Sequence, residues 1–223
     1  MDQEKSPKRA LSTRLIVGMI LGATLIAGSA FAIGFAAAPV NPMPDSTSAE
    51  AGFSRDMQTH HIQAVEMSMI LLDRTEDPAM RMLAEDIATA QQHQVGQMYA
   101  WLSVWGVPQA APEPSMTWMT RPTLEGANHD HSGEDGGTAH VPGGPMPGMA
   151  TPEQMAELET LSGVAAEKLF LELMITHHIA GVEMAEAILD RSTNRAVTDA
   201  ARGMVLVQQG EIDYMNDLLD ERR

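Results

Sequence analysis

Two stretches decide the fold of this chain: MQTHHIQAVEM at residues 57–67 and MITHHIAGVEM at residues 174–184, which lies 117 positions later. The match continues at the same offset on both sides of the two stretches. Identical residues include Phe53 and Phe170, Leu72-Asp73-Arg74 and Leu189-Asp190-Arg191, Gln91-Gln92 and Gln208-Gln209, Met98 and Met215, and Leu102 and Leu219. Identity at one fixed offset over about fifty positions indicates that a helical unit has been duplicated.

The first repeat has the pattern of a helical hairpin. Apolar residues recur at spacings of three and four, for example over residues 80–87, which is the periodicity of an amphipathic helix. The first hairpin is predicted over residues 47–105. One helix is expected from about Thr47 or Ser54 to Arg74, and a second helix from Pro78, after the N-cap Asp77, to the end of the hairpin.

The second hairpin is predicted over residues 151–223. Its first helix opens with the capping box Thr151-Pro-Glu-Gln154 and is expected to continue to Arg191, with a bend near Gly163. Its second helix follows Asn194, which occupies the position of Asp77 in the first repeat. Two hairpins that share one core predict an all-α fold with a four-helix bundle.

The N-terminal segment has the pattern of a membrane anchor. Residues 1–14 carry four basic side chains, and Leu15–Ala38 is almost wholly apolar. A helix of that length spans about 36 Å, which exceeds a hydrocarbon core of about 30 Å. We therefore expect a basic cytoplasmic segment over 1–14 and a transmembrane helix over 15–40, with the repeats outside the membrane. The alternative is a signal peptide cleaved at Ala30-Phe31-Ala32, which would make the protein secreted.

Composition excludes several classes of protein. The chain has no cysteine, so it forms neither a disulfide nor a thiolate metal site. Its formal charge is −16, and removing residues 1–40, with four basic and two acidic side chains, leaves −18. This charge argues against a nucleic-acid partner, which requires a basic surface. An acidic surface instead raises the local concentration of cations.

Residues 106–150, between the repeats, are rich in proline and glycine. We expect a flexible linker here, because the segment has too little apolar surface to fold alone. Its length would also permit exchange of hairpins between subunits, so a homo-oligomer is one alternative. The linker carries His129, His131, His140, Met146 and Met149, which either decorate a passive tether or form a loose second metal site.

The repeated motif places its histidines and methionines on one helical face. At 100° per residue, Met57, His60, His61 and Met67 fall within an arc of about 120°. Imidazole and thioether groups favour copper, and thioether sulfur favours Cu(I). The predicted copper ligands are Met57, His60, His61, Met67, Met174, His177, His178 and Met184, and weaker candidates are His93, Met98 and Met215.

The alternatives to a copper-binding protein are a metal-free structural module and an enzyme. Buried histidines are often hydrogen-bonded core residues and methionines often fill cores, which would make the chain a metal-free structural or interaction module of the cell envelope. A di-iron oxidase needs Glu-x-x-His on two helices, and no histidine of this chain has a glutamate three residues earlier. We therefore expect no enzymatic activity and no catalytic residues.

The motif Met-x-x-His-His-x-x-Ala/Gly-x-x-Met, followed by a short turn and a helix with Gln/Glu-x-x-x-Met, resembles the domain of unknown function 305 family. Both Phe53–Leu102 and Phe170–Leu219 carry the pattern, whereas Thr59 and Thr176 stand where the family often has proline. The resemblance implies a ferritin-like bundle in an exported or membrane-anchored periplasmic protein. It also implies a copper-binding protein that sequesters copper or delivers it to a receiving protein, through the eight predicted ligands.

Overall fold

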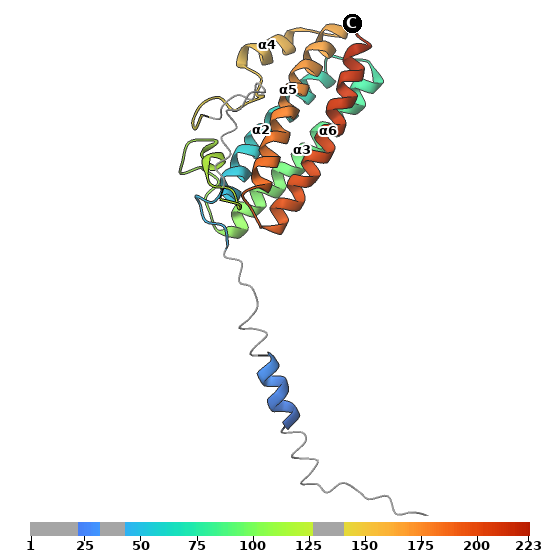
Figure 1. Ribbon diagram of the computed structural model, residues 1–223. Coiled ribbons are helices and arrows are strands. Elements are labelled where there is room, and N and C mark those ends of the chain that lie inside the picture. The colour runs from blue at the N-terminus through green and yellow to red at the C-terminus, as the bar shows by residue number, and fades with distance from the viewer. Residues whose placement is uncertain (1–21, 32–42, 127–140) are drawn as a thin grey trace, which may run out of the picture. The chain divides into compact units, whose positions relative to one another are not determined.

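The computed structural model describes residues 22–31, 43–126 and 141–223 (Figure 1). The chain divides into two units, residues 1–42 and residues 43–223. In the first unit, residues 22–31 form a helix. Within the described parts of the chain, no helix is both long and apolar enough to span a membrane. The remaining residues of the anchor predicted over 15–40 lie outside the described residues.

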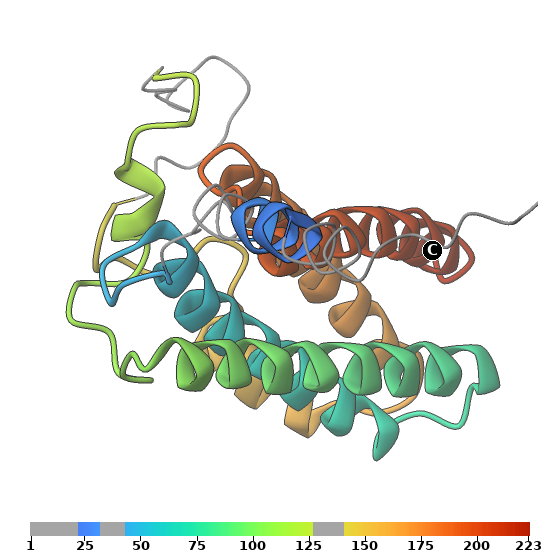
Figure 2. The ribbon, with the colours of Figure 1, turned by 90° about the horizontal axis from the view of Figure 1, so that it is seen from below.

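The second unit is built from helices, and no strand occurs in its described residues. Helices α2 (Ala49–Leu72) and α3 (Pro78–Trp105) form one hairpin, and α5 (Val164–Leu189) and α6 (Arg195–Asp220) form the other. The hairpins pack against each other through α2 and α5 (Figures 1 and 2). Two short elements complete the unit: a 3-10 helix, η1 (Thr117–Thr120), and α4 (Pro152–Thr160). The prediction of an all-helical fold is confirmed.

Local sequence signals explain where the long helices begin. The carboxylate of Asp77 accepts hydrogen bonds from the amides of Ala79 and Met80 at 2.8 and 3.1 Å, which caps α3. Asn194 caps α6 in the same way. The capping box of Thr151 and Gln154 is present, but it opens the short helix α4. These side chains satisfy amides that would otherwise lack partners at a helix start.

One predicted helix is divided in two. The sequence suggested a bent helix from Thr151 to Arg191, whereas α4 ends at Thr160 and α5 begins at Val164. Leu161 is extended, and Gly163 has φ 55° and ψ −143°. A side chain rarely adopts such a backbone conformation, so glycine permits a complete break here rather than a bend.

Hydrogen bonds at both ends of α2 and α5 hold the two helices antiparallel. At one end, the Ser192 hydroxyl donates to Glu50 at 2.7 Å. At the other end, Thr75 donates to Glu167, whose carboxylate also accepts a hydrogen bond from Arg222 at 2.8 Å. Because the helices are antiparallel, the His-His pairs near their midpoints meet.

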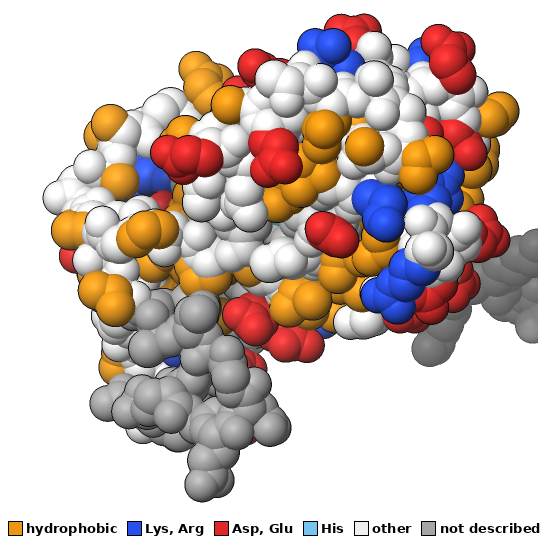
Figure 3. All heavy atoms as spheres, turned by 90° about the horizontal axis from the view of Figure 1, so that it is seen from above, with side chains coloured by type: hydrophobic (Ala, Val, Ile, Leu, Met, Phe, Trp, Pro, Cys, Tyr) orange, Lys and Arg blue, Asp and Glu red, His pale blue; other side chains and the backbone are white. Residues whose placement is uncertain are grey.

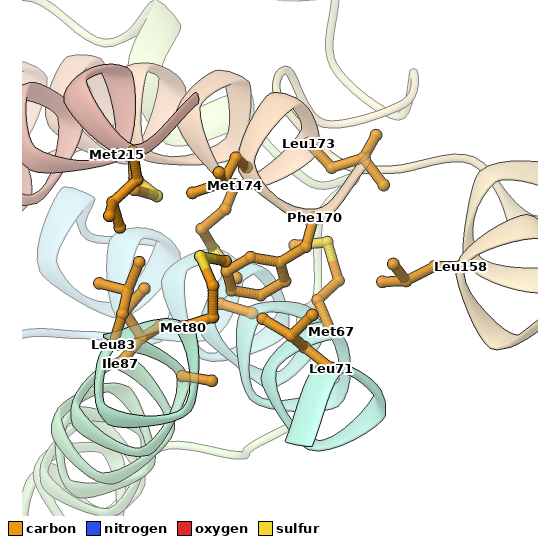
Figure 4. Close-up of a cluster of buried hydrophobic side chains, with 14 of the residues drawn as sticks. Met67, Leu71, Met80, Leu83, Ile87, Leu158, Phe170, Leu173, Met174 and Met215 are labelled. Atoms are coloured by element: carbon orange, nitrogen blue, oxygen red, sulfur yellow. The ribbon is translucent and has the colours of Figure 1, made fainter. Parts of the chain in front are cut away.

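The core consists of two clusters, named here by the short element beside each. The α4-side cluster contains Leu158, Phe170, Met67, Met174, Met80 and Met215 among others (Figure 4). The η1-side cluster contains Phe53, Trp118, Met57, Met98, Met184 and Met204 among others. The surface differs from this interior: the face seen in Figure 3 exposes acidic and apolar side chains but, among the described residues, no histidine.

The described residues of the predicted linker, 106–126 and 141–150, include side chains that pack against the bundle. Trp118 is buried, with its ring edge-on to Phe53 at a centroid distance of 5.6 Å. Asp56 holds this segment by accepting hydrogen bonds from the Met116 amide at 2.7 Å and from the Trp118 indole at 3.0 Å. These contacts attach residues 116–118 of the predicted linker to α2. Histidines 129, 131 and 140 lie outside the described residues.

Candidate metal centre

Four buried histidines form a row where α2 crosses α5. His60 and His177 lie at the centre, with their rings stacked at a centroid distance of 3.7 Å and an interplanar angle of 27°. The His61 ring lies 6.3 Å from that of His60, and the His178 ring lies 6.1 Å from that of His177. His61 and His178 also lie close enough for their charges to interact. All four residues are at most 1% exposed. We call this arrangement the imidazole row.

Oxygen acceptors fix the tautomers of three of these rings. The Nε2 atom of His61 lies 2.6 Å from Gln94 Oε1, and that of His178 lies 2.9 Å from Glu211 Oε2. The Nε2 atom of His177 lies 2.9 Å from the His60 carbonyl oxygen. Each oxygen only accepts, so Nε2 carries the proton and donates, and Nδ1 keeps a free lone pair.

The Nδ1 atoms of His61, His177 and His178 are buried without a hydrogen-bond partner in the protein. Neither ring nitrogen of His60 has a partner in good hydrogen-bond geometry, although the backbone of Pro147 lies close enough to His60 to interact with it. Burial without a partner costs free energy that a ligand would recover. A metal-binding histidine commonly donates its other ring N–H to a carboxylate or carbonyl oxygen, which orients the ring. The row has this arrangement at three positions, so the chemistry of these three rings suits a metal ligand.

Electrostatics favours neutral imidazoles. Burial, together with the charge of neighbouring histidines, lowers the pKa of His60 from 6.5 to about 3. Burial also lowers the pKa of His61 to about 4 and that of His177 well below its usual value. These three rings therefore stay unprotonated near neutral pH, and the unprotonated ring is the form that binds metals.

The predicted methionine ligands are all fully buried but lie in two different clusters. Met57 and Met184 belong to the η1-side cluster with Met98. Met67 and Met174 belong to the α4-side cluster with Met215 (Figure 4). Because α2 and α5 are antiparallel, each side of the imidazole row thus receives one motif thioether from each repeat.

Two expectations about ligands do not match the arrangement. His93 is exposed on α3 and is not brought to the buried row. Among the described residues, no three His, Asp or Glu side chains stand in a geometry that could hold a metal together. The stacked rings of His60 and His177 face each other, so convergence of their Nδ1 atoms on one ion requires the rings to turn.

A strap of residues 146–150 covers part of the row. The Ala150 amide donates to Gln63 Oε1 at 2.7 Å, and the Gln63 amide donates to the Ala150 carbonyl at 2.9 Å, which pins the strap to α2. Gly148, at φ 74°, lies so close to α5 that a Cβ there would be 2.5 Å from Ala180 Cβ and 2.8 Å from the Thr176 carbonyl oxygen. The strap therefore passes directly beside His177.

The small residues of the two motifs have different surroundings. A Cβ at Gly181 would lie 2.4 Å from Gln208 Oε1, so the glycine makes room for a buried glutamine. The corresponding Ala64 is fully buried in the α4-side cluster. The amides of Gln91 and Gln208 are buried with atoms that lack a hydrogen-bond partner. Space at Gly181 is thus filled by Gln208 rather than left for an ion.

Sequence reasoning did not assign a role to Gln63, Gln94 or Glu211. Gln94 and Glu211 do occupy equivalent positions in the repeats, four residues before Met98 and Met215. A polar residue at the same place in both repeats was the available signal. Their role became evident only from the distances to His61 and His178.

The sequence of residues 50–219 matches the family described as Domain of unknown function (DUF305). Among solved structures, that of a proposed secreted DUF305 protein from Streptomyces coelicolor is 45% identical and superposes with a TM-score of 0.67 over 79% of this chain and 95% of that one. A DUF305 fragment from Deinococcus radiodurans is 32% identical, with a TM-score of 0.60 over 80% of this chain and 99% of that one.

Two further matches are a solved structure with the same fold and a short sequence match. CopM in its Cu(I)-bound form is 19% identical, with a TM-score of 0.56 over 78% of this chain and 96% of that one. An uncharacterised protein of Acanthamoeba polyphaga mimivirus is 35% identical over 57 residues, which are 26% of this chain and 38% of that protein's length. The match over 50–219 and the identity to two solved DUF305 structures have one conclusion: this chain belongs to the DUF305 family.

Proposed function

We propose that this protein binds copper outside the cytoplasmic membrane, either to sequester it or to deliver it to a receiving protein. The observation that carries the proposal is the imidazole row. It holds four buried rings, three of which are oriented through Nε2 and have no protein partner at Nδ1. Structures of CopM in Cu(I)-bound, Cu(II)-bound and Ag-bound forms share the fold and support a metal-related role.

The ligand types favour copper as the cargo. His60, His61, His177 and His178 supply imidazole nitrogen, and Met57, Met67, Met174 and Met184 supply thioether sulfur on both sides of the row. Thioether sulfur selects soft ions, so Cu(I) is the preferred state, whereas imidazole accepts both oxidation states. Met98 and Met215 stand second to these as ligands, because each lies in the same cluster as two motif methionines.

The placement of this function follows from the N-terminal segment. Basic residues before an apolar run of this length support the proposed location of the bundle outside the membrane. Such a protein is a carrier or store rather than an enzyme. Its acidic character attracts cations to its surface.

A metal-free structural module is the second candidate. The stacking of His60 on His177 and the three Nε2 hydrogen bonds favour it, because they are also what a histidine core requires. The two candidates differ in what the free Nδ1 atoms do. In the structural module they remain without a partner, and in the copper protein they bind the ion.

The test uses the full chain, purified in detergent without a His tag. Competition titration with a Cu(I) chelator should show tight binding, and zinc should bind more weakly. Replacing His60, His61, His177 and His178 together by glutamine should abolish tight Cu(I) binding, with a smaller effect on thermal stability without metal. Wild-type protein that binds no copper, or prefers zinc, would contradict the proposal. A variant that unfolds without metal would favour the structural module.

A further inference from the structure

The two ends of the imidazole row differ in charge. At one end, His61 donates to the neutral amide oxygen of Gln94 at 2.6 Å. At the other end, His178 donates to the carboxylate of Glu211 at 2.9 Å. Gln94 and Glu211 stand 117 residues apart, at equivalent positions of the repeats. Two otherwise matched half-sites therefore have different acceptors behind the same ring atom.

The charge of Glu211 is not neutralised by a basic residue. Among the described residues, its carboxylate forms no ion pair with lysine or arginine, and its contact is with His178. The Glu211 side chain is 19% exposed, whereas the His178 side chain is fully buried. The negative charge of Glu211 therefore acts on the buried His178 ring, where water screens it less than at the surface.

We propose that Glu211 and Gln94 are positioning residues that give the two ends of the row different preferences for the oxidation state of copper. This inference rests on the proposed function. The Glu211 end favours Cu(II), and the Gln94 end favours Cu(I). A carboxylate acceptor makes the imidazole a stronger donor, and its Coulomb attraction is twice as large for a doubly charged ion as for a singly charged one.

Copper therefore meets two different environments, one at His61 beside Gln94 and one at His178 beside Glu211. Both places belong to one cluster of four rings, in which three pairs of centroids lie 3.7 to 6.3 Å apart and the charges of His61 and His178 are close enough to interact. Copper that arrives as Cu(II) is held first at the Glu211 end, and copper in the reduced state is held at the Gln94 end. No electron transfer by the protein is implied, since the oxidation state is that of the arriving ion.

The experiment exchanges the two acceptors in the full chain. Glu211→Gln makes both ends neutral, and Gln94→Glu makes both anionic, with little change in side-chain volume. Cu(II) and Cu(I) affinities are measured by competition with chelators, and Ag(I) serves as a redox-inert substitute for Cu(I). Glu211→Gln should lower the ratio of Cu(II) to Cu(I) affinity about tenfold, which raises the one-electron potential of bound copper by about 59 mV. Gln94→Glu should shift the ratio in the opposite direction.

Asp213→Asn is the matched control, because it removes one negative charge from an exposed position on the same helix. It should change the ratio by less than about twofold, as expected for a solvent-screened charge. Equal effects of Glu211→Gln on both oxidation states, no effect on either, or the same effect from Asp213→Asn would overturn the inference. Wild-type protein that binds no copper would instead overturn the proposed function. If Glu211→Gln is unstable, Gln94→Glu decides alone.

Discussion

The two repeats supply the same histidines and methionines where α2 crosses α5, but they differ in the residues that support these side chains. Both supply two histidines and two methionines at the same helical positions. Behind these groups, Gln94 is replaced by Glu211, Ala64 by Gly181 and Ser68 by Ala185. The donor residues therefore match between the repeats, while the groups that support them do not: His177 Nε2 donates to the His60 carbonyl, whereas His60 Nε2 has no such bond. This difference suggests that donor identity sets which metal binds and that the supports adjust how it binds.

Removing one half of the row should have the largest effect. Replacing His60 and His61 by glutamine, or His177 and His178 by glutamine, should weaken Cu(I) binding by more than about a hundredfold, since loss of even a supporting partner costs 10- to 100-fold. Both pairs contribute because His60 and His177 are in contact. Chelator competition on the two double variants measures this. If either variant retains half of the copper with unchanged affinity, the repeats are independent sites.

Acid should destabilise the metal-free protein through the same histidines. In the folded state the pKa of His60 is about 3 and that of His61 about 4, below the value of about 6.5 in the unfolded chain. The unfolded state therefore binds more protons, and stability falls as the pH drops from about 6.5 toward 4. The loss at pH 5 is about 2 kcal/mol for each of these residues. Urea unfolding at pH 7.5, 6 and 5 measures it.

The His60→Gln variant sharpens this test. It should lose stability less steeply with falling pH than the wild type, because one group with a lowered pKa is gone. Identical slopes for the two proteins would show that His60 is not buried in its neutral form.

The strap allows a comparison between two glycines with the same φ angle. Gly148 and Gly126 both have φ 74°, but a Cβ at Gly148 would meet α5, whereas a Cβ at Gly126 has nothing within 4 Å. Gly126→Ala should cost about 1 kcal/mol from backbone strain alone. Gly148→Ala should cost about 1–3 kcal/mol more, because the contacts are backbone and a short side chain that cannot move aside. Equal costs by urea unfolding would place the strap away from α5.

The smallest effect is expected at Gly181. A Cβ there meets only the flexible end of Gln208, and alanine gains about 1 kcal/mol of helix propensity over glycine. Gly181→Ala should therefore change the free energy of unfolding by less than about 1 kcal/mol, and Ala64→Gly should destabilise by about that amount. A large loss from Gly181→Ala would indicate that the Gln208 position is fixed more tightly than its missing hydrogen bonds suggest.

The sequence predicted the helices well because the signals for them are local. The 117-residue repeat located both hairpins, and Asp77, Asn194 and Gly106 mark helix ends that depend on neighbouring residues only. The position of each His-His pair on one helical face, together with the motif methionines, also followed from the spacing. The break at Gly163 was underestimated as a bend, because sequence alone does not reveal a φ of 55°.

What could not be predicted depends on contacts between distant residues. The acceptors of His61 and His178 lie 33 positions away, on the second helix of each hairpin, so their role depends on how the two helices are aligned. The distribution of the methionines over two clusters required the antiparallel packing of α2 and α5. In the sequence, Gly148 is one of several linker glycines. Only the structure shows that its close contact with Thr176 and Ala180 requires a glycine there.

The central claim is that the free Nδ1 atoms of the imidazole row are the atoms that bind copper. It is tested most directly by long-range proton–nitrogen NMR of the histidine rings in ¹⁵N-labelled full chain, with and without Ag(I) as a diamagnetic substitute for Cu(I). The account predicts that the Nδ1 signals of His60, His61, His177 and His178 shift on binding, while the Nε2 protons of His61, His177 and His178 remain. Bound metal with all four Nδ1 signals unchanged would contradict it.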